Sequence, residues 1–212
     1  MVDVVTWENA HLFGSALVSH HRLRYRLFVE RQGWDVPCFH GMEYDQFDTP
    51  AAVYLLLRDD QDEVRGTTRL IPTTRPYMIK EVWPELVDSH VLPSSTEIWE
   101  GTRFGVEPGL GAVERNRATA ELVLACLEFG LLNGIRQYLV LMPNLIIRRI
   151  IGAAGCDFEL LGTPRQLGSH RVAVAAVDVS HGALAEARRR FAIHNPVLNP
   201  NHLPNHLKEE AA

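Results

Sequence analysis

A strand–helix–strand unit in the middle of the chain limits the possible folds more than any other segment does. EIWEGTRFGV at 97–106 and QYLVLM at 137–142 have the β-branched and aromatic residues typical of strands. Between them, RATAELVLACLEFGLLN at 117–133 is a strong helix pattern that is apolar on most sides, which predicts a deeply buried helix. A buried helix between two strands favours an α/β fold.

Further strands and helices are expected on both sides of this unit. AVYLLLR at 52–58 and VRGTTRLI at 64–71 flank the polar turn DDQDE and predict a hairpin, which makes the sheet mixed. The other expected segments are strands at 2–7, 156–162 and 171–179 and helices at 11–32, 144–153 and 180–192. We therefore predict a three-layer α/β/α sandwich in one domain at 1–193, followed by an extended tail at 194–212.

Composition excludes several classes of protein. The 212 residues include 21 basic and 26 acidic ones, and the net charge of −5 disfavours a general nucleic-acid binder. The N-terminus MVDVVTWENA lacks a basic segment before an apolar one, so we expect no signal peptide, and no apolar run approaches the ~20 residues of a membrane span. Three cysteines without a CxxC pattern suggest neither a disulfide framework nor a zinc site, which fits the cytoplasm.

Charged and aromatic residues gather in segments where a solvated loop would not need them. His20, Arg24 and Phe28 are spaced i, i+4, i+8 on one face of the first predicted helix. The segment MEYDQFD and the strands at 64–71 and 97–106 contribute further charges, namely Glu43, Asp45, Asp48, Arg69, Glu100 and Arg103. Carboxylates among aromatic rings suit a cationic or amino-bearing ligand. The alternative is a set of ion pairs that only holds the scaffold together.

Four segments, in this order over residues 22–106, resemble the acyl-homoserine-lactone synthases of bacterial quorum sensing. They are RLRYRLFVERQGWDV, MEYDQFD, GTTRLIPTTRPYMIKEVWPEL and EIWEGTRFGV, and a weaker match continues to about residue 165. The resemblance implies a fold similar to the GNAT acetyltransferases. It also implies that the amine of S-adenosylmethionine takes an acyl group from acyl-carrier protein or acyl-CoA. The methionine carboxylate then closes a lactone and expels methylthioadenosine, so S-adenosylmethionine is a consumed substrate and neither a cofactor nor a metal is expected.

The resemblance also assigns roles to residues of this chain. S-adenosylmethionine has an adenine that can stack on an aromatic ring, a sulfonium that can face one, and a carboxylate that an arginine can bind. The resemblance places this substrate against Arg24, Phe28, Trp34, Asp45, Asp48, Arg69 and Phe104. Glu100 matches the proposed general base, with Asp45 and Arg103 as further catalytic candidates. Glu43 and Asp45 are rival bases. A backbone N–H that stabilises the developing oxyanion is another possible contribution.

Glu100 and Arg103 set a geometric test of this assignment. They are three residues apart on a predicted strand, and strict alternation would put their side chains on opposite faces. If both belong to the site, an extra residue must be inserted near Gly101 or Thr102, and we therefore predict a β-bulge there.

The acyl chain and its carrier need their own residues. Wall candidates for an apolar tunnel are Gly101, Leu127, Leu141 and Ile147, and candidates for contact with carrier protein or CoA are Arg115, Arg148 and Arg149. The alternative is an ordinary core for the former and a solvated helix face for the latter. Leu141 falls where many members that use 3-oxo-acyl chains have threonine, and leucine cannot donate a hydrogen bond to a 3-oxo group. This predicts an unsubstituted or branched acyl chain.

Two other functions share parts of the pattern. A GNAT-type N-acyltransferase acting on another amine would have the same fold without needing Trp34, Asp45 and Asp48. A non-catalytic sensor of acyl thioesters would keep the tunnel and lose Glu100 or the arginines. The sequence leaves open the acyl length, the donor, the order of binding, the general base and the oligomeric state.

Overall fold

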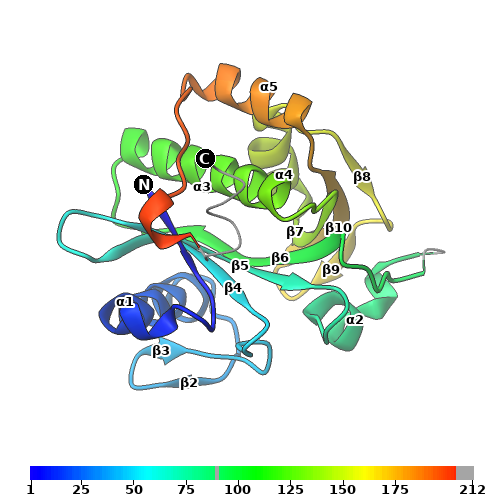
Figure 1. The fold of residues 1–212 in the computed structure, drawn as a ribbon. Helices are drawn as coiled ribbons and strands as arrows, with labels where there is room; N and C mark the ends of the chain where they lie inside the picture. The colour runs from blue at the N-terminus through cyan, green and yellow to red at the C-terminus, as the bar shows by residue number, and fades with distance from the viewer. Residues whose placement is uncertain (89–90, 204–212) are drawn as a thin grey trace. The chain divides into compact units, whose positions relative to one another are not determined.

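The computed structural model describes residues 1–88 and 91–203 (Figure 1). The chain forms two compact units: unit 1 contains Met1–Arg69, Arg103–Ala125 and the chain from Pro196, and unit 2 contains Leu70–Thr102 and Cys126–Asn195. The single domain predicted for 1–193 runs through both units, and their unity as one domain stays a prediction.

The predicted mixed sheet is confirmed. Its strands are β1 (Val2–Val5), β4 (Val53–Arg58), β5 (Val64–Pro72), β6 (Ile98–Val106), β7 (Gln137–Pro143), β8 (Phe158–Leu160), β9 (Arg165–Leu167) and β10 (His170–Asp178). The order is β1-β4-β5-β6-β7-β10-β8, with β9 also paired to β10. β1 is antiparallel to β4 and β10 is antiparallel to β7, whereas β6 and β7 are parallel. The short strands β2 (Cys38–Phe39) and β3 (Met42–Glu43) form a separate hairpin where the sequence predicts only a loop.

The helices agree with the predicted positions but not with the predicted continuity. They are η1 (Ala10–Leu12), α1 (Gly14–Arg24), η2 (Tyr25–Glu30), α2 (Met78–Val82), η3 (Pro84–Leu86), α3 (Ala112–Leu132), α4 (Asn144–Ile147), η4 (Arg148–Gly152), α5 (His181–Phe191) and η5 (Pro200–His202). The continuous helix predicted over 11–32 is wrong: a short 3₁₀ turn comes first, and α1 widens into the π-helical turn η2. The helix predicted over 144–153 likewise widens from α4 into the π-helical turn η4. Such π turns often occur at functional sites.

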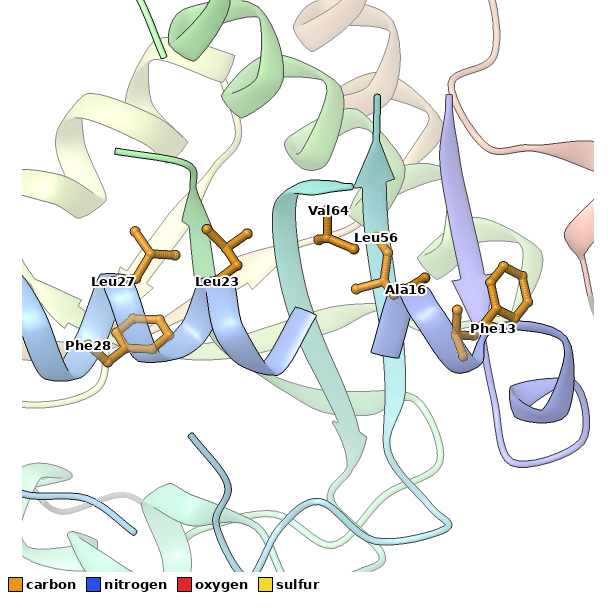
Figure 2. Packing of buried hydrophobic residues seen from close by; sticks show 8 residues of the cluster. Phe13, Ala16, Leu23, Leu27, Phe28, Leu56 and Val64 are labelled. Atoms are coloured by element: carbon orange, nitrogen blue, oxygen red, sulfur yellow. The ribbon is translucent and has the colours of Figure 1, made fainter. Parts of the chain in front are cut away.

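One face of α1 and η2 builds the apolar core of unit 1. Its side chains pack against β1, β4 and β5 (Figure 2), in a cluster of Val5, Phe13, Ala16, Leu23, Leu27, Phe28, Leu56 and Val64. These side chains are almost fully buried, and each large one contributes roughly 1.5–3 kcal/mol by leaving water. The core therefore fixes where the polar residues of the same helix point.

Within unit 1, helices cover both faces of β5. Neighbouring residues of a strand point to opposite faces. The Thr67 hydroxyl lies 2.8 Å from His20 Nδ1 of α1. At the adjacent Gly66, a side chain would collide with Leu122 of α3 at 2.9 Å. This arrangement gives the layered α/β architecture that the sequence predicts.

The described part of the predicted tail lies along β1 rather than away from the protein. Val2 N–H donates to Val197 O, and Asn199 N–H donates to Val2 O, both at 2.8 Å. His202 contacts the Asp3 carboxylate and packs edge-on against Phe13. The rest of the tail, 204–212, lies outside the described residues. Among the described residues, none of the helices has both the length and the apolar composition that a membrane span requires.

Candidate active site

Charged side chains from four segments of unit 1 meet in one buried cluster. Arg24 comes from α1, Arg69 from β5 and Arg103 from β6, while Glu43, Asp45 and Asp48 come from one segment that starts in β3 and continues into the following loop. These six residues, called here the arginine–carboxylate cluster, are joined by the ion pairs of Arg24 with Glu43 and Asp48, of Arg69 with Asp45 and Asp48, and of Arg103 with Glu43 and Asp45. The structure thus brings six of the predicted charged residues together, whereas their role in binding a substrate stays a prediction.

Arg24 has no exposed surface, and its donors are almost all engaged. Nε–H donates to Glu43 Oε2, while Nη1 and Nη2 grip Asp48 Oδ1 and Oδ2 at 2.7 and 3.0 Å. Nη1 also lies 3.4 Å from His20 Nε2. Four of the five N–H groups of a guanidinium are thus directed at protein atoms. In this arrangement Arg24 organises Glu43 and Asp48.

Asp48 is the acceptor that connects the most segments. Its Oδ1 accepts from Arg24 Nη1, from Arg69 Nη1 at 2.8 Å and from Tyr54 Oη at 2.9 Å. Its Oδ2 accepts from Arg24 Nη2 and from the backbone N–H of Asp45 at 2.9 Å. A carboxylate offers about four lone-pair sites, so Asp48 is held from all sides. This bonding fixes the loop between β3 and β4 against α1 and β5.

The backbone of β6 is irregular at Arg103. Its φ of 53° is in the left-handed region, which costs a residue with a side chain about 1–2 kcal/mol. The parallel ladder between β6 and β7 ends two residues earlier, at Gly101 opposite Val140. Regular alternation is therefore broken, and Glu100 and Arg103 are both buried although they are three residues apart. The backbone of β6 is therefore irregular at Arg103, next to the predicted position, and the inserted residue of a β-bulge near Gly101 or Thr102 stays a prediction.

The cluster balances its own charge. Three guanidinium groups face three carboxylates, and buried charges are tolerated only when each one is paired. Burial by itself would raise the pKa of the Asp48 carboxyl, but the hydrogen bonds and charges of Arg24 and Arg69 outweigh burial and hold that pKa well below its usual range. The pKa values of Glu43 and Asp45 are lowered for the same reason. All three acids are thus ionised at neutral pH.

Two aromatic rings lie beside the cluster at the end of η2. Gly33, in the left-handed conformation (φ 66°), lets the backbone N–H of Trp34 turn back to Phe28 O at 2.9 Å. The two rings stack with centroids 4.9 Å apart and planes 18° apart. The Arg103 guanidinium carbon lies 5.4 Å from the Phe28 ring centre and 5.7 Å from that of Trp34, within cation–π range. Trp34 is 37% exposed and Phe28 is buried, so Trp34 offers the ring that a ligand can reach.

Two histidines on α1 make the free energy of unfolding depend on pH, at pH values higher than those at which carboxylates titrate. Burial and then the charge of Arg24 lower the pKa of His20 and His21 below 6.5. Below pH 6.5 the unfolded chain therefore binds protons that the folded protein does not. The contribution of the two neutral histidines to the free energy of unfolding is fully present above that pH. On acidification the free energy of unfolding should fall by up to about 1.4 kcal/mol per pH unit for each histidine.

Urea unfolding at pH 7.5, 6.5 and 5.5 measures this slope. Glu43, Asp45 and Asp48, whose pKa values are lowered, add their own loss only below about pH 4, so the two effects are separable. Replacing the exposed His40 with asparagine is the control and should leave the slope unchanged. A flat free energy of unfolding between pH 7.5 and 5.5 would contradict the burial of neutral histidines.

Glu100 lies in unit 2 and caps a helix. Its Oε2 accepts from Met78 N at 2.9 Å and its Oε1 from Ile79 N at 2.7 Å, and the side chain is fully buried. The first N–H groups of a helix have no partner within it, and a carboxylate there is stabilising. Glu100 therefore holds the start of α2. Its role as general base stays a prediction.

Comparisons with known proteins identify the family. A model described as autoinducer synthase matches residues 10–186. The chain belongs to the autoinducer synthase family. Curated relatives of the chain are named acyl-homoserine-lactone synthases, and the chain is an acyltransferase of this class. The resemblance noted from the four sequence segments is confirmed.

Two curated relatives show how far the family likeness extends. The acyl-homoserine-lactone synthase of Pseudomonas aeruginosa is 32% identical over 181 residues, which cover 84% of this chain and 87% of that protein. The isovaleryl-homoserine lactone synthase of Bradyrhizobium diazoefficiens is 34% identical over 190 residues, which cover 87% and 82%.

Solved structures of family members have the same fold. The CoA-dependent acyl-homoserine lactone synthase BjaI, solved with SAM and isopentyl-CoA, superposes with a TM-score of 0.88 at 30% identity and covers 100% of this chain and 98% of that one. The synthase LasI gives 0.77 at 28% identity and covers 88% and 93%. An N-acetyltransferase-like protein from Lactobacillus plantarum, at 15% identity and a TM-score of 0.56, shows the relation of this fold to acetyltransferases.

The remaining predicted residues lie outside the cluster. In unit 2, Leu127 and Ile147 are buried, Gly101 and Leu141 are half-buried, and Arg148 and Arg149 are exposed. In unit 1, Arg115 and Phe104 are half-buried. Their assignments to the acyl wall, the donor contact and the S-adenosylmethionine site stay predictions.

Tyr54 and His20 belong to the cluster's surroundings, and the sequence reasoning gave them no role. The Tyr54 hydroxyl donates to Asp48, and the Tyr54 ring lies 4.7 Å from the His20 ring. The spacing of His20, Arg24 and Phe28 did place His20 on the right face. The spacing along the helix could not show that Tyr54 of β4 lies against His20 of α1.

Proposed function

We propose that this family member makes an N-acyl-homoserine lactone from S-adenosylmethionine and an acyl-CoA whose acyl chain is unsubstituted or branched. The observation that carries the proposal is the arginine–carboxylate cluster beside the stacked Phe28 and Trp34 rings. An exposed ring next to ordered carboxylates suits a substrate that has an adenine, a sulfonium and an amine. A non-catalytic sensor of acyl thioesters would not need such a site.

The reaction consists of two bond exchanges. The amine of S-adenosylmethionine loses a proton and attacks the thioester carbon, so that an amide C–N bond forms and CoA leaves as its thiol. The carboxylate oxygen then attacks the γ-carbon, a lactone C–O bond forms and the C–S bond to the sulfonium breaks. Methylthioadenosine leaves neutral, and one proton is released overall.

The environment of each residue indicates its role in this reaction. Asp45 and Asp48 would orient the amine, and Trp34 would stack on the adenine or face the sulfonium. Glu43 and Asp45 have lowered pKa values and are therefore weak proton acceptors. Glu100 is the candidate base on the strength of its place in the Glu-x-x-Arg-Phe pattern that the chain shares with the family. The irregular backbone at Arg103 is the candidate for N–H groups that meet the oxyanion.

CoA and a branched chain are favoured by the relatives. BjaI was solved with isopentyl-CoA, and the Bradyrhizobium relative is named for an isovaleryl product. Leu141 offers no donor to a 3-oxo group. A cytoplasmic location, where both substrates would be found, stays part of the proposal.

A donor panel tests the function. Purified protein is incubated with S-adenosylmethionine and isovaleryl-CoA, hexanoyl-CoA, 3-oxohexanoyl-CoA or the same acyl groups on acyl-carrier protein, and lactone and methylthioadenosine are measured by mass spectrometry. We expect both products with isovaleryl-CoA or hexanoyl-CoA and at least ten times less with 3-oxohexanoyl-CoA. Amide without lactone would show acyl transfer without ring closure and would contradict lactone synthesis.

Replacing Trp34 with alanine should raise the KM for S-adenosylmethionine about tenfold or more. Stacking of a base on an aromatic side chain is worth about 1–3 kcal/mol, and 1.4 kcal/mol is a factor of ten. Trp34→Phe keeps a ring and is the matched control, for which we expect a change within about threefold. An unchanged KM in Trp34→Ala would remove Trp34 from the site.

A further inference from the structure

Three consecutive residues of α1 bind three different neighbours. Ser19 Oγ donates to Glu63 Oε2 at 2.6 Å, His20 Nδ1 lies 2.8 Å from Thr67 Oγ1, and His21 Nδ1 lies 2.9 Å from Glu43 O. His20 alone among them also contacts an arginine of the cluster, with Nε2 3.4 Å from Arg24 Nη1. It is completely buried, so its hydrogen bonds cannot be replaced by bulk water.

The chemistry of these two partners determines the form of the His20 ring. A guanidinium can only donate, so Nε2 must present its lone pair to Arg24. The neutral ring then carries its proton on Nδ1, and that N–H donates to the Thr67 hydroxyl oxygen. A proton on Nε2 would place two donors against each other in a buried space.

His20 also supports the second group that orients Asp48. Its ring lies 4.7 Å from the ring of Tyr54, whose hydroxyl donates to Asp48 Oδ1 at 2.9 Å. Arg24 grips both oxygens of the same carboxylate. Two of the groups that hold Asp48 in place, Arg24 and Tyr54, therefore rest against one imidazole.

We propose that His20, as a neutral imidazole with its proton on Nδ1, is a positioning residue that holds Arg24 and Tyr54 so that Asp48 is set for S-adenosylmethionine. It acts through Arg24 and Asp48 and does not contact the substrate. The proposal rests on the proposed function for its kinetic consequence, whereas the state of the ring is independent of that function.

Two substitutions each retain one of the two hydrogen-bonding functions of the imidazole, the Nε2 acceptor or the Nδ1 donor. In His20→Gln the amide carbonyl can take the place of Nε2 and accept from Arg24, whereas in His20→Asn the shorter amide can replace only the Nδ1 donor to Thr67. With saturating isovaleryl-CoA, we expect the KM for S-adenosylmethionine to stay within about threefold in His20→Gln and to rise about tenfold or more in His20→Asn. The kcat of His20→Asn should fall by less than its KM rises. Equal KM values in the two variants, or a loss confined to kcat, would overturn the proposal.

A measurement on the unmodified protein does not depend on how the variants fold. With ¹⁵N-labelled histidine, NMR at pH 7.5 identifies which ring nitrogen carries the proton, and the His20 signals are those missing from His20→Gln. We expect a proton on Nδ1 alone, and a proton on Nε2 or a cationic ring would overturn the proposal. A protein with the expected ring that releases no methylthioadenosine would instead refute the proposed function.

Discussion

Replacing Asp48 with asparagine is expected to lower the free energy of unfolding by about 3–5 kcal/mol, the usual cost of breaking a buried ion pair from one side. The change removes one negative charge from three guanidinium groups that face three carboxylates. It also puts an amide NH₂ among groups that themselves donate, namely Arg24, Arg69, Tyr54 and the N–H of Asp45. Urea unfolding at pH 7.5, followed by tryptophan fluorescence, measures the loss.

Asp62→Asn is the matched control for this measurement. Asp62 pairs with Arg58 at 2.8 Å, but its side chain is 71% exposed. Its φ of 64° suits asparagine as well as aspartate. We expect a change within about 0.5 kcal/mol, because exposed pairs contribute little. If Asp48→Asn cost less than about 1 kcal/mol, the cluster would not depend on mutual charge balance.

The sequence predicted which segments form the site because each one has a chemical pattern of its own. The sequence itself contains the motif MEYDQFD, the arginine of β5 and the Glu-x-x-Arg of β6. Because side chains alternate along a strand, the spacing of Glu100 and Arg103 also predicts an irregularity in β6. The structure shows an irregular backbone close to the predicted position, in the left-handed conformation of Arg103.

The partners within the site were less predictable, because they depend on distances between elements. Nothing in the spacing of residues 43–48 marks Asp48 as the carboxylate that Arg24, Arg69 and Tyr54 share. The π-helical turn over Tyr25–Glu30 was missed for a related reason. A segment of six residues is too short for its residue types to distinguish an i→i+5 turn from an i→i+4 turn.

Glu100 shows how one residue can be predicted for one role and found in another. Capping residues are expected next to the helix that they cap, but Glu100 is 22 positions after Met78, whose N–H it accepts. Its place three residues before Arg103 on one strand limits the distance between their Cα atoms to about 11 Å. A carboxylate held rigidly by a helix start is also a well-oriented group for proton transfer, so the two roles are compatible.

Replacing Glu100 with glutamine is expected to slow turnover about 10²-fold or more if its carboxylate accepts the amine proton. Because the amide can accept from only one of Met78 and Ile79, some loss of stability, about 1–3 kcal/mol, should accompany the change. Rates are therefore measured well below the unfolding temperature and corrected for the folded fraction. Glu97→Gln, which alters a largely exposed partner of Arg136, is the control and should keep its rate.

The pH profile of kcat separates the base from the helix cap. A base gives the unmodified enzyme an acidic limb, in which turnover rises with pH as the carboxylate loses its proton, and Glu100→Gln should lack this limb. A carboxylate that only holds α2 would leave the shape of the profile unchanged in the variant and lower the rate in proportion to the loss of folded protein. A fall in kcat of less than about threefold, with the limb intact, would transfer the role of base to Asp45 or Glu43. Their arginine partners would then have to release a carboxylate during the reaction, since the pKa of each is lowered as long as those pairs persist.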